Sequence, residues 1–94
     1  MIFIYTDKFS YELEKLDNSV SIFVIKKINQ SIIEKKFKKL KHFNVNILKI
    51  GPYRVGFIDN EDKRIFLFVG THKEYEQWCS KLTKEKMLEI LTIY

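Results

Sequence analysis

Residues 45–70 read VNILKIGPYRVGFIDNEDKRIFLFVG, and this stretch decides the fold. From Val45 onward the side chains follow a period of two, which is the pattern of a β-strand. Gly51-Pro52 interrupts the pattern, because proline fixes φ and lacks the N–H that a sheet needs. A second, polar break covers residues 60–63. These short breaks predict three antiparallel strands joined by tight turns, at residues 45–50, 53–59 and 64–69.

The residues before this stretch predict a strand followed by two helices. Residues 2–5 form a short apolar, β-favouring run, and Thr6 or Asp7 can cap a helix that begins after it. A break at residues 17–19 separates that helix from a second one. Two antiparallel helices joined in this way would bury one apolar seam. The apolar residues at helical spacing are Phe9, Leu13 and Leu16 in the first helix and Val20, Phe23, Val24 and Ile28 in the second.

The residues after Gly70 predict two more helices. Thr71 and Glu74 have the spacing of a capping box, in which Thr71 caps the helix and Glu74 reaches back. Thr83 can cap a last helix. The element order predicts one α+β domain over residues 1–94. Its N-terminal strand and two-helix hairpin pack on an antiparallel β-meander, a C-terminal helix follows, and helices cover one face of the sheet. The apolar residues of the last two helices are Tyr75, Trp78, Leu82, Met87, Leu88 and Leu91.

The composition is that of an ordered globular protein. Of the 94 residues, 46% are hydrophobic, with one proline and three glycines. No apolar run approaches the roughly 20 residues that span a bilayer, and the apolar start is too short for a secretion signal. The single Cys79 allows no internal disulfide, as is usual in the cytoplasm. We therefore expect a cytoplasmic protein with no membrane partner.

Positive charge is concentrated in the middle of the sequence. The formal net charge is +5, yet between Lys26 and Arg54 Glu34 is the single acidic residue among many lysines. Such a block favours a polyanionic partner, because each neutralised phosphate releases a bound counterion. A solvated, lysine-rich face is the alternative interpretation.

The sequence offers little support for a metal or a cofactor. His42, His72 and Cys79 have no ligand-like spacing among them. Three scattered glycines cannot build a phosphate-cradling loop, and no motif marks a Ser-His-Asp triad. We predict that the protein uses neither a metal nor a cofactor.

Two cations on neighbouring predicted strands are candidates for chemistry. Lys49 lies on the first strand of the meander, and Arg54 lies just past the turn that follows. Adjacent antiparallel strands can bring both side chains to one phosphate, where two cations stabilise a charge-rich transition state. Arg54 offers a planar fork, and Lys49 offers a point charge or a proton relay. The alternative is that both are ordinary residues of a strand surface.

His72 begins the helix that follows the third strand. Imidazole titrates near neutrality, and a helix N-terminus helps to seat an anion, so this position suits acid–base chemistry on RNA. A histidine that only makes a hydrogen bond near the cap is the alternative. Tyr75 and Trp78 on the same helix either anchor it in the core or stack on a base. The core is the preferred interpretation for Trp78.

Two segments carry a resemblance when they are taken in order. The first is Ile47-Leu48-Lys49-Ile50-Gly51-Pro52-Tyr53-Arg54-Val55, and the second is Phe66-Leu67-Phe68-Val69-Gly70-Thr71-His72-Lys73-Glu74-Tyr75. They resemble the RelE/ParE toxin superfamily of type II toxin–antitoxin systems. That family shows a basic residue, a Gly-containing turn and Tyr-Arg, and later an apolar strand that ends in a Gly-His/Arg-basic-acidic-Tyr run. The second segment is most similar to HigB-type toxins, and the likeness covers nearly the whole chain.

The resemblance implies a toxin whose partner is a cognate antitoxin. RelE- and HigB-like members are endoribonucleases that cleave mRNA in the ribosomal A site without a metal. The 2′-hydroxyl attacks the adjacent phosphate and leaves a 2′,3′-cyclic phosphate and a 5′-hydroxyl. Carried over by position, Lys49 and Arg54 would hold the phosphate, and His72, with Lys73 as the alternative, would exchange protons. Tyr75 or Trp78 would contact the base. The lysines that would dock on ribosomal RNA are Lys38, Lys39 and Lys41.

Three departures from the family pattern favour a HigB-like site over a RelE-like one. Ile47 stands where RelE proteins often have a further basic residue, His72 stands where arginine is frequent, and the chain has only two arginines. ParE-like members share the fold and inhibit DNA gyrase without catalysis, and an inactive RNA-binding relative is a third hypothesis. An antitoxin would neutralise the toxin by covering its basic groove or by displacing the helix over residues 83–94.

Overall fold

The three central strands form as predicted, with slightly different bounds. In the computed structural model, which describes residues 1–34, 38–40 and 43–94, they are β3 (Asn46–Ile50), β4 (Tyr53–Asn60) and β5 (Lys63–Thr71). The pairing is antiparallel, and each connecting turn has two residues because Ile50 lies opposite Tyr53 and Asn60 lies opposite Lys63. Gly51 in the first turn has a φ of +55°, which glycine adopts without steric cost.

Six further elements of the described residues surround this meander. The sheet order is β1-β5-β4-β3-β2, and β1 runs parallel to β5 while every other pair is antiparallel. The short edge strand β2 consists of two residues of the lysine cluster and was not predicted. The surrounding elements are β1 (Ile2–Tyr5), α1 (Asp7–Glu14), α2 (Asn18–Glu34), β2 (Lys38–Lys39), α3 (His72–Ser80) and α4 (Lys84–Ile93).

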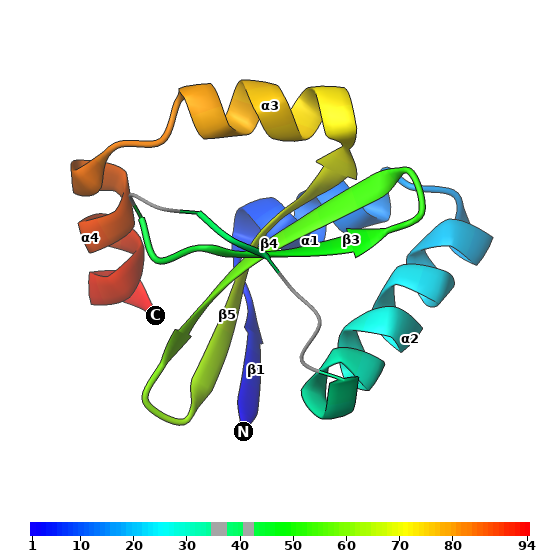
Figure 1. The fold of residues 1–94 in the computed structure, drawn as a ribbon, viewed down its shortest axis with the longest axis horizontal. Helices are drawn as coiled ribbons and strands as arrows, with labels where there is room; N and C mark the ends of the chain where they lie inside the picture. Colours follow the sequence, from blue (N-terminus) through cyan, green and yellow to red (C-terminus); the bar gives the residue numbers. More distant parts are fainter. Residues whose placement is uncertain (35–37, 41–42) are drawn as a thin grey trace.

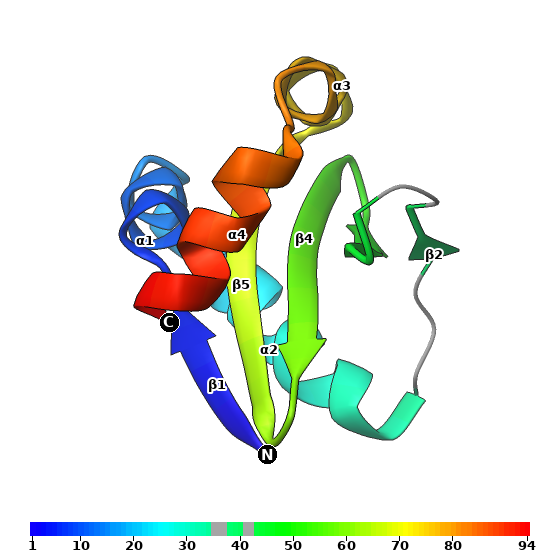
Figure 2. The same cartoon turned by 90° about the vertical axis from the view of Figure 1, so that its left-hand side faces the viewer.

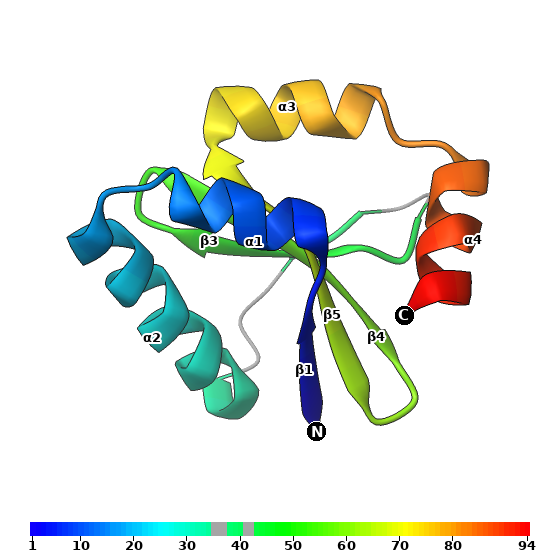
Figure 3. The same cartoon turned by 180° about the vertical axis from the view of Figure 1, so that it is seen from behind.

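Helices cover both faces of the sheet, so the prediction of helices on one face was wrong. Successive residues of a strand point to opposite faces. Leu48 packs with Phe9 and Val24 of α1 and α2, whereas its neighbour Ile47 belongs to a second core with residues of α3 and α4. Figure 1 shows α1 behind the sheet, and Figure 3, seen from behind, shows it in front. The strands are apolar at consecutive positions, and such strands need cover on both sides.

The first core, under α1 and α2, is centred on Phe66. Its fully buried ring lies 5.1 Å from the ring of Phe3 and 5.6 Å from the ring of Phe57, measured between centroids. The rings of Tyr5 and Phe9 lie at 5.4 and 5.5 Å. Edge and tilted arrangements at these distances add to the stabilisation from burial itself. One residue of β5 therefore connects β1, α1 and β4.

The three helix caps expected at threonines are confirmed. Thr6 accepts a hydrogen bond from the N–H of Phe9, so Thr6 and not Asp7 is the cap of α1. Thr71 and Glu74 form both bonds of a capping box at α3, at 3.3 and 2.9 Å. Thr83 caps α4. The caps fix where each helix begins, and the one at Thr71 makes His72 the first residue of α3.

The second core, under α3 and α4, is built around Trp78. The indole stacks on Phe68 with ring centroids 5.0 Å apart, and it lies so close over Gly56 that a Cβ there would come within 2.9 Å of it. A register shift at Gly56 leaves Leu67 outside the β4–β5 pairing, so that Leu67 and Phe68 both contribute to this core. Figure 2 shows α3 nearly end-on, at the top of the molecule. The packing agrees with the core interpretation of Trp78.

Several apolar residues at helical spacing are exposed. Phe23 on α2 is 46% exposed, although Val24 and Ile28 of the same helix are fully buried. On α4 Met87 is buried, whereas Leu88 and Leu91 are 63% and 40% exposed. Helical periodicity therefore overestimated the buried face of both helices. No helix among the described residues is long and apolar enough to cross a bilayer.

Candidate active site

The strand register places the two predicted cations side by side. Lys49 on β3 lies directly opposite Arg54 on β4, which in turn lies opposite Gly70 on β5. Directly opposite residues have Cβ atoms about 4.5–5.5 Å apart on one face, and like charges at such positions destabilise a sheet. An anion held between the two side chains would remove that repulsion. The expectation that these strands bring Lys49 and Arg54 together is confirmed.

The guanidinium of Arg54 is positioned by the adjacent turn. Its Nη1 donates to the carbonyl oxygen of Tyr53 at 3.0 Å and to that of Gly51 at 3.3 Å. Among the ion pairs of the described residues, none involves Arg54 or Lys49. Two positive charges that form no ion pair with the described carboxylates give this part of the meander a positive potential, which favours an anionic ligand.

The second arginine of the chain has a structural role. Arg64 on β5 is buried and forms a two-point ion pair with Asp59 on β4, with Nε–Oδ1 and Nη2–Oδ2 distances of 2.8 and 3.0 Å. Its guanidinium also lies over the ring of Phe57, 4.5 Å from the centroid. Arg64 thus ties the far end of the hairpin together. Of the two arginines, Arg54 is the one that faces the candidate site.

His72 lies beside the cation row at the N-terminus of α3. It follows Gly70, the residue opposite Arg54, by two positions, and the orphan N–H groups of a helix start favour an anion here. Its Nε2 lies 2.7 Å from Oε1 of Glu76, one helical turn further on, and both side chains are more than half exposed. Glu76, which was not singled out from the sequence, therefore orients the imidazole. The i, i+4 spacing was the signal that could have found it.

Glu74, in contrast, is occupied by the helix cap. The hydrogen bonds from Thr71 lower the pKa of the Glu74 carboxyl, because they stabilise its charged form. A carboxylate held in this way is a poor proton acceptor. The acid–base role is therefore left to groups outside the cap.

Tyr75 lies one turn after His72, with the two ring centroids 6.0 Å apart. Burial raises the pKa of its phenol to about 12, because the phenolate is poorly solvated there, and a hydrogen bond with Cys79 acts in the same direction. The nearby charge of Arg54 opposes this rise. At neutral pH Tyr75 is consequently an uncharged hydroxyl that can donate a hydrogen bond near the cations.

The titration of Tyr75 predicts a loss of stability at alkaline pH. The phenol ionises near pH 10 in the unfolded chain and at about 12 in the folded one. The unfolded state therefore loses its proton first, and the free energy of unfolding falls as pH rises from about 10 to about 12. Urea titrations across this range should show a smaller fall for Tyr75→Phe than for the unmodified protein. Equal falls in both proteins would mean that Tyr75 ionises normally.

The other predicted contacts are spread more widely. Lys73 is exposed beside His72 on α3, and Lys39 is exposed on β2 opposite Asn46. Lys38 belongs to β2, and Lys41 lies outside the described residues. Ile47, at the position where a further basic residue was considered, is buried in the second core. The structure thus places Lys49 and Arg54 opposite each other, and His72, Lys73 and Tyr75 lie in the first part of α3, directly after the strand that pairs with β4. Lys38 and Lys39 pair with the other end of β3.

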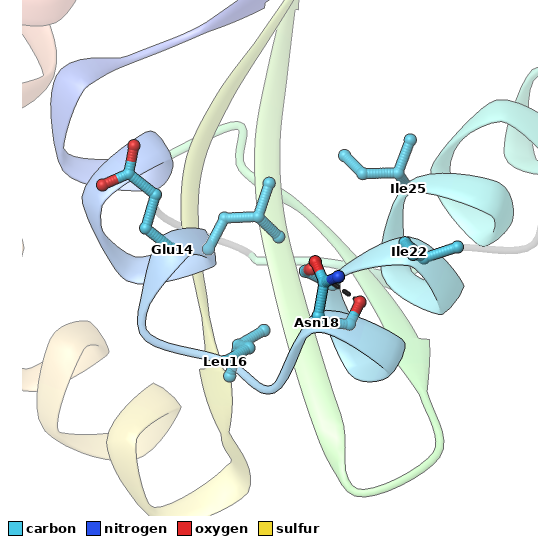
Figure 4. Close-up of a pocket in the computed structure, with 7 residues that line it drawn as sticks. Glu14, Leu16, Asn18, Ile22 and Ile25 are labelled. Carbon is cyan, nitrogen blue, oxygen red and sulfur yellow. Dashed lines mark hydrogen bonds between the residues drawn. The ribbon is translucent and has the colours of Figure 1, made fainter.

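Two hollows lie next to helix α2. The larger one, between α1 and α2, has a volume of about 530 Å³ and a mainly apolar wall. Figure 4 shows Leu16, Ile22 and Ile25 around it together with Glu14. The charged side chain at this hollow is acidic, so it does not suit a phosphate. The smaller hollow lies between α2 and β3 and includes Lys49. In the part of the chain that the structure describes, no cluster of three His, Cys, Asp or Glu side chains could hold a metal ion.

Comparison with known proteins shows the fold of this chain and nothing beyond the fold. No protein-family model matches the sequence, and no curated protein matches it. Among solved structures, the RelBE2 toxin–antitoxin complex of Mycobacterium tuberculosis matches with a TM-score of 0.64 and 15% identity, over 76% of this chain and 96% of that chain. The RelB–RelE antitoxin–toxin complex of Methanococcus jannaschii matches with a TM-score of 0.65 and 19% identity, over 80% and 96%. The chain has a RelE-type fold.

A further structure has the same RelE-type fold at a lower similarity. The solution structure of the conserved hypothetical protein HP0894 from Helicobacter pylori matches with a TM-score of 0.51 and 17% identity, over 78% of this chain and 96% of that chain. The matches extend over nearly the full length of each solved chain, so the likeness concerns the whole RelE-type fold. A fold does not by itself assign an activity, which has to be argued from the site.

Proposed function

We propose that this protein is the toxin of a type II toxin–antitoxin system and that it cleaves mRNA on the ribosome, in the manner of RelE- and HigB-type toxins. The observation that carries the proposal is the row made by Lys49 and Arg54, which lie directly opposite each other next to a helix N-terminus that begins with His72. The RelE-type fold supports it, because the neighbours with this fold include two toxin–antitoxin complexes.

The chemistry that this arrangement suits is transfer of a phosphoryl group within the RNA. Arg54 and Lys49 would bind the non-bridging oxygens of the scissile phosphate, where negative charge grows in the transition state. His72 would take the proton of the 2′-hydroxyl, whose oxygen then forms a bond to phosphorus. The bond from phosphorus to the 5′-oxygen breaks, and that oxygen takes a proton from water. The products are a 2′,3′-cyclic phosphate and a 5′-hydroxyl.

The remaining residues of the site would bind and orient the substrate. Tyr75 can donate a hydrogen bond to a base or a phosphate beside Arg54, and Lys73 is the alternative proton carrier next to His72. Trp78 offers only the part of its ring that the core leaves exposed. The lysines that would dock on ribosomal RNA, of which Lys39 is seen to be exposed, are Lys38, Lys39 and Lys41.

A cognate antitoxin is the proposed protein partner. Two of the structures with this fold are complexes of that kind. Helix α4 carries three exposed apolar side chains, Leu88, Leu91 and Ile93, of which Leu88 and Leu91 lie on one side at a spacing of three residues. An amphipathic antitoxin segment could cover them with its apolar side while its acidic side meets the basic edge. Such a segment would neutralise the toxin by covering the basic edge or by displacing α4.

The proposal predicts that His72→Ala abolishes mRNA cleavage. Induced expression of the unmodified protein should stop growth and produce new 5′ ends within mRNA, detected by primer extension, and the variant should produce none. The matched control is Lys84→Ala, a substitution at an exposed residue that begins α4, away from the site. Growth arrest with intact mRNA and inhibited DNA supercoiling would instead indicate a gyrase inhibitor.

A further inference from the structure

The smaller hollow, which Lys49 borders, combines an aromatic ring and a lysine of α2, and the sequence did not predict it. It lies between α2 and β3, and its volume of about 280 Å³ is just below the usual range for ligand sites. We propose that it binds one nucleotide of single-stranded RNA, adjacent to the phosphate that Lys49 and Arg54 hold. This inference rests on the proposed function. The residues around the hollow are Phe23, Lys27, Ser31, Leu48, Lys49, Ile50 and Gly51.

The aromatic side of the hollow is Phe23. Its ring is 46% exposed, although the adjacent Val24 is fully buried, so the phenyl group does little for the core. Exposed aromatic side chains of this kind are the usual platforms on which proteins stack unpaired bases, since every base has a π-face. The exposed phenyl ring at the wall of the hollow can therefore stack on a base of the RNA.

The cationic side chain of α2 at the hollow is Lys27, and Lys49 borders the hollow from β3. The ammonium of Lys27 lies 5.5 Å from the centroid of the Phe23 ring. Such a cation–π contact is weak at an exposed site, so the flexible lysine can leave the ring for a phosphate. No carboxylate is among the described residues around this hollow, whereas Glu14 borders the larger one between α1 and α2. The ring of Phe23 and the ammonium of Lys27 match the base and the phosphate of one nucleotide.

The position of the hollow connects it to the candidate active site. Lys49 belongs to both, because it borders the hollow and lies directly opposite Arg54. An RNA molecule whose scissile phosphate lies at the Lys49–Arg54 pair can therefore place a neighbouring nucleotide on Phe23. The RNA would run from the N-terminus of α3 across the edge of the meander toward α2.

The experiment compares adjacent residues of α2 as matched pairs. A labelled single-stranded RNA of about six nucleotides, with 2′-O-methyl groups that prevent cleavage, is titrated with the full chain, and binding is followed by fluorescence anisotropy. We expect Phe23→Ala to weaken binding about tenfold, whereas Ile22→Ala, at a neighbour that is 63% exposed and lines the other hollow, has little effect. Lys27→Ala should lower the slope of log K against log salt by about 0.7. Lys26→Ala removes the same charge one residue away and should change the slope less.

The inference would be overturned if Phe23→Ala had the same effect as Ile22→Ala and Lys27→Ala the same effect as Lys26→Ala. It would also be overturned if the unmodified protein did not bind the RNA. A glutamate-rich peptide that binds with the same dependence on Phe23 and Lys27, and that displaces the RNA, would assign the hollow to a protein partner and also overturn it. Cleavage of ribosome-bound mRNA is measured separately. If the pairs differ but mRNA stays intact, the subsite stands and the nuclease proposal fails. If mRNA is cleaved but the two variants of each pair have equal effects, the nuclease proposal stands and the subsite fails.

Discussion

Replacing Arg54 by alanine is expected to lower the rate of mRNA cleavage on programmed ribosomes by about 100- to 1,000-fold, the effect of losing one preorganised donor to a developing oxyanion. The guanidinium is held by the carbonyl oxygens of the preceding turn, at 3.0 and 3.3 Å, so it is in place before the substrate binds. Single-turnover kinetics with a labelled mRNA measure the effect. Arg54→Lys should recover part of the rate, because it keeps the charge and loses the planar fork.

The same substitution should leave the fold intact. Arg54 makes its hydrogen bonds to its own turn, and its neighbour across the sheet is another cation. The free energy of unfolding, from urea titration, should therefore change by no more than about 0.5 kcal/mol, as for most substitutions at partly exposed positions. Full cleavage activity in a folded Arg54→Ala protein would remove the phosphate-binding role from this residue.

Replacing Phe66 by alanine is expected to give the largest loss of stability. Its buried ring contacts aromatic rings from β1, α1 and β4, and truncating such a side chain costs about 3–5 kcal/mol. That is a large part of the roughly 5–15 kcal/mol that stabilises a typical domain. Urea unfolding followed by circular dichroism should show a variant that is largely or wholly unfolded. The control is Tyr11→Ala, which truncates an exposed ring on α1. A Phe66→Ala protein as stable as this control would contradict the assigned core.

Local patterns predicted most of the elements correctly. Alternation around Gly51-Pro52 located β3 and β4, and from that register the meeting of Lys49 and Arg54 followed directly. The hydroxyl and carboxylate of Thr71 and Glu74 act on N–H groups within four residues, so their capping box could also be recognised without tertiary information.

Long-range contacts were beyond these patterns. The parallel pairing of β1 with β5 joins Tyr5 to Phe66, and no local signal specifies a partner so distant in sequence. Helical spacing treats Phe23 and Val24 alike, yet the sheet covers one and leaves the other exposed. The burial of Arg64 also depends on its ion pair with Asp59 across the hairpin, a contact that was not predicted from the sequence. Which cation is structural becomes evident only after the strands are paired.

The most direct test of ribonuclease activity uses purified protein and ribosomes programmed with one defined mRNA. A single 2′-deoxy substitution is placed at the nucleotide on the 5′ side of the cleaved bond. We predict cleavage of the unmodified mRNA to a 2′,3′-cyclic phosphate, and no cleavage at the substituted position, because the attacking hydroxyl is absent. Cleavage of both mRNAs at the same position, or of neither, would contradict the proposal that this RelE-type fold acts as a ribosome-directed endoribonuclease.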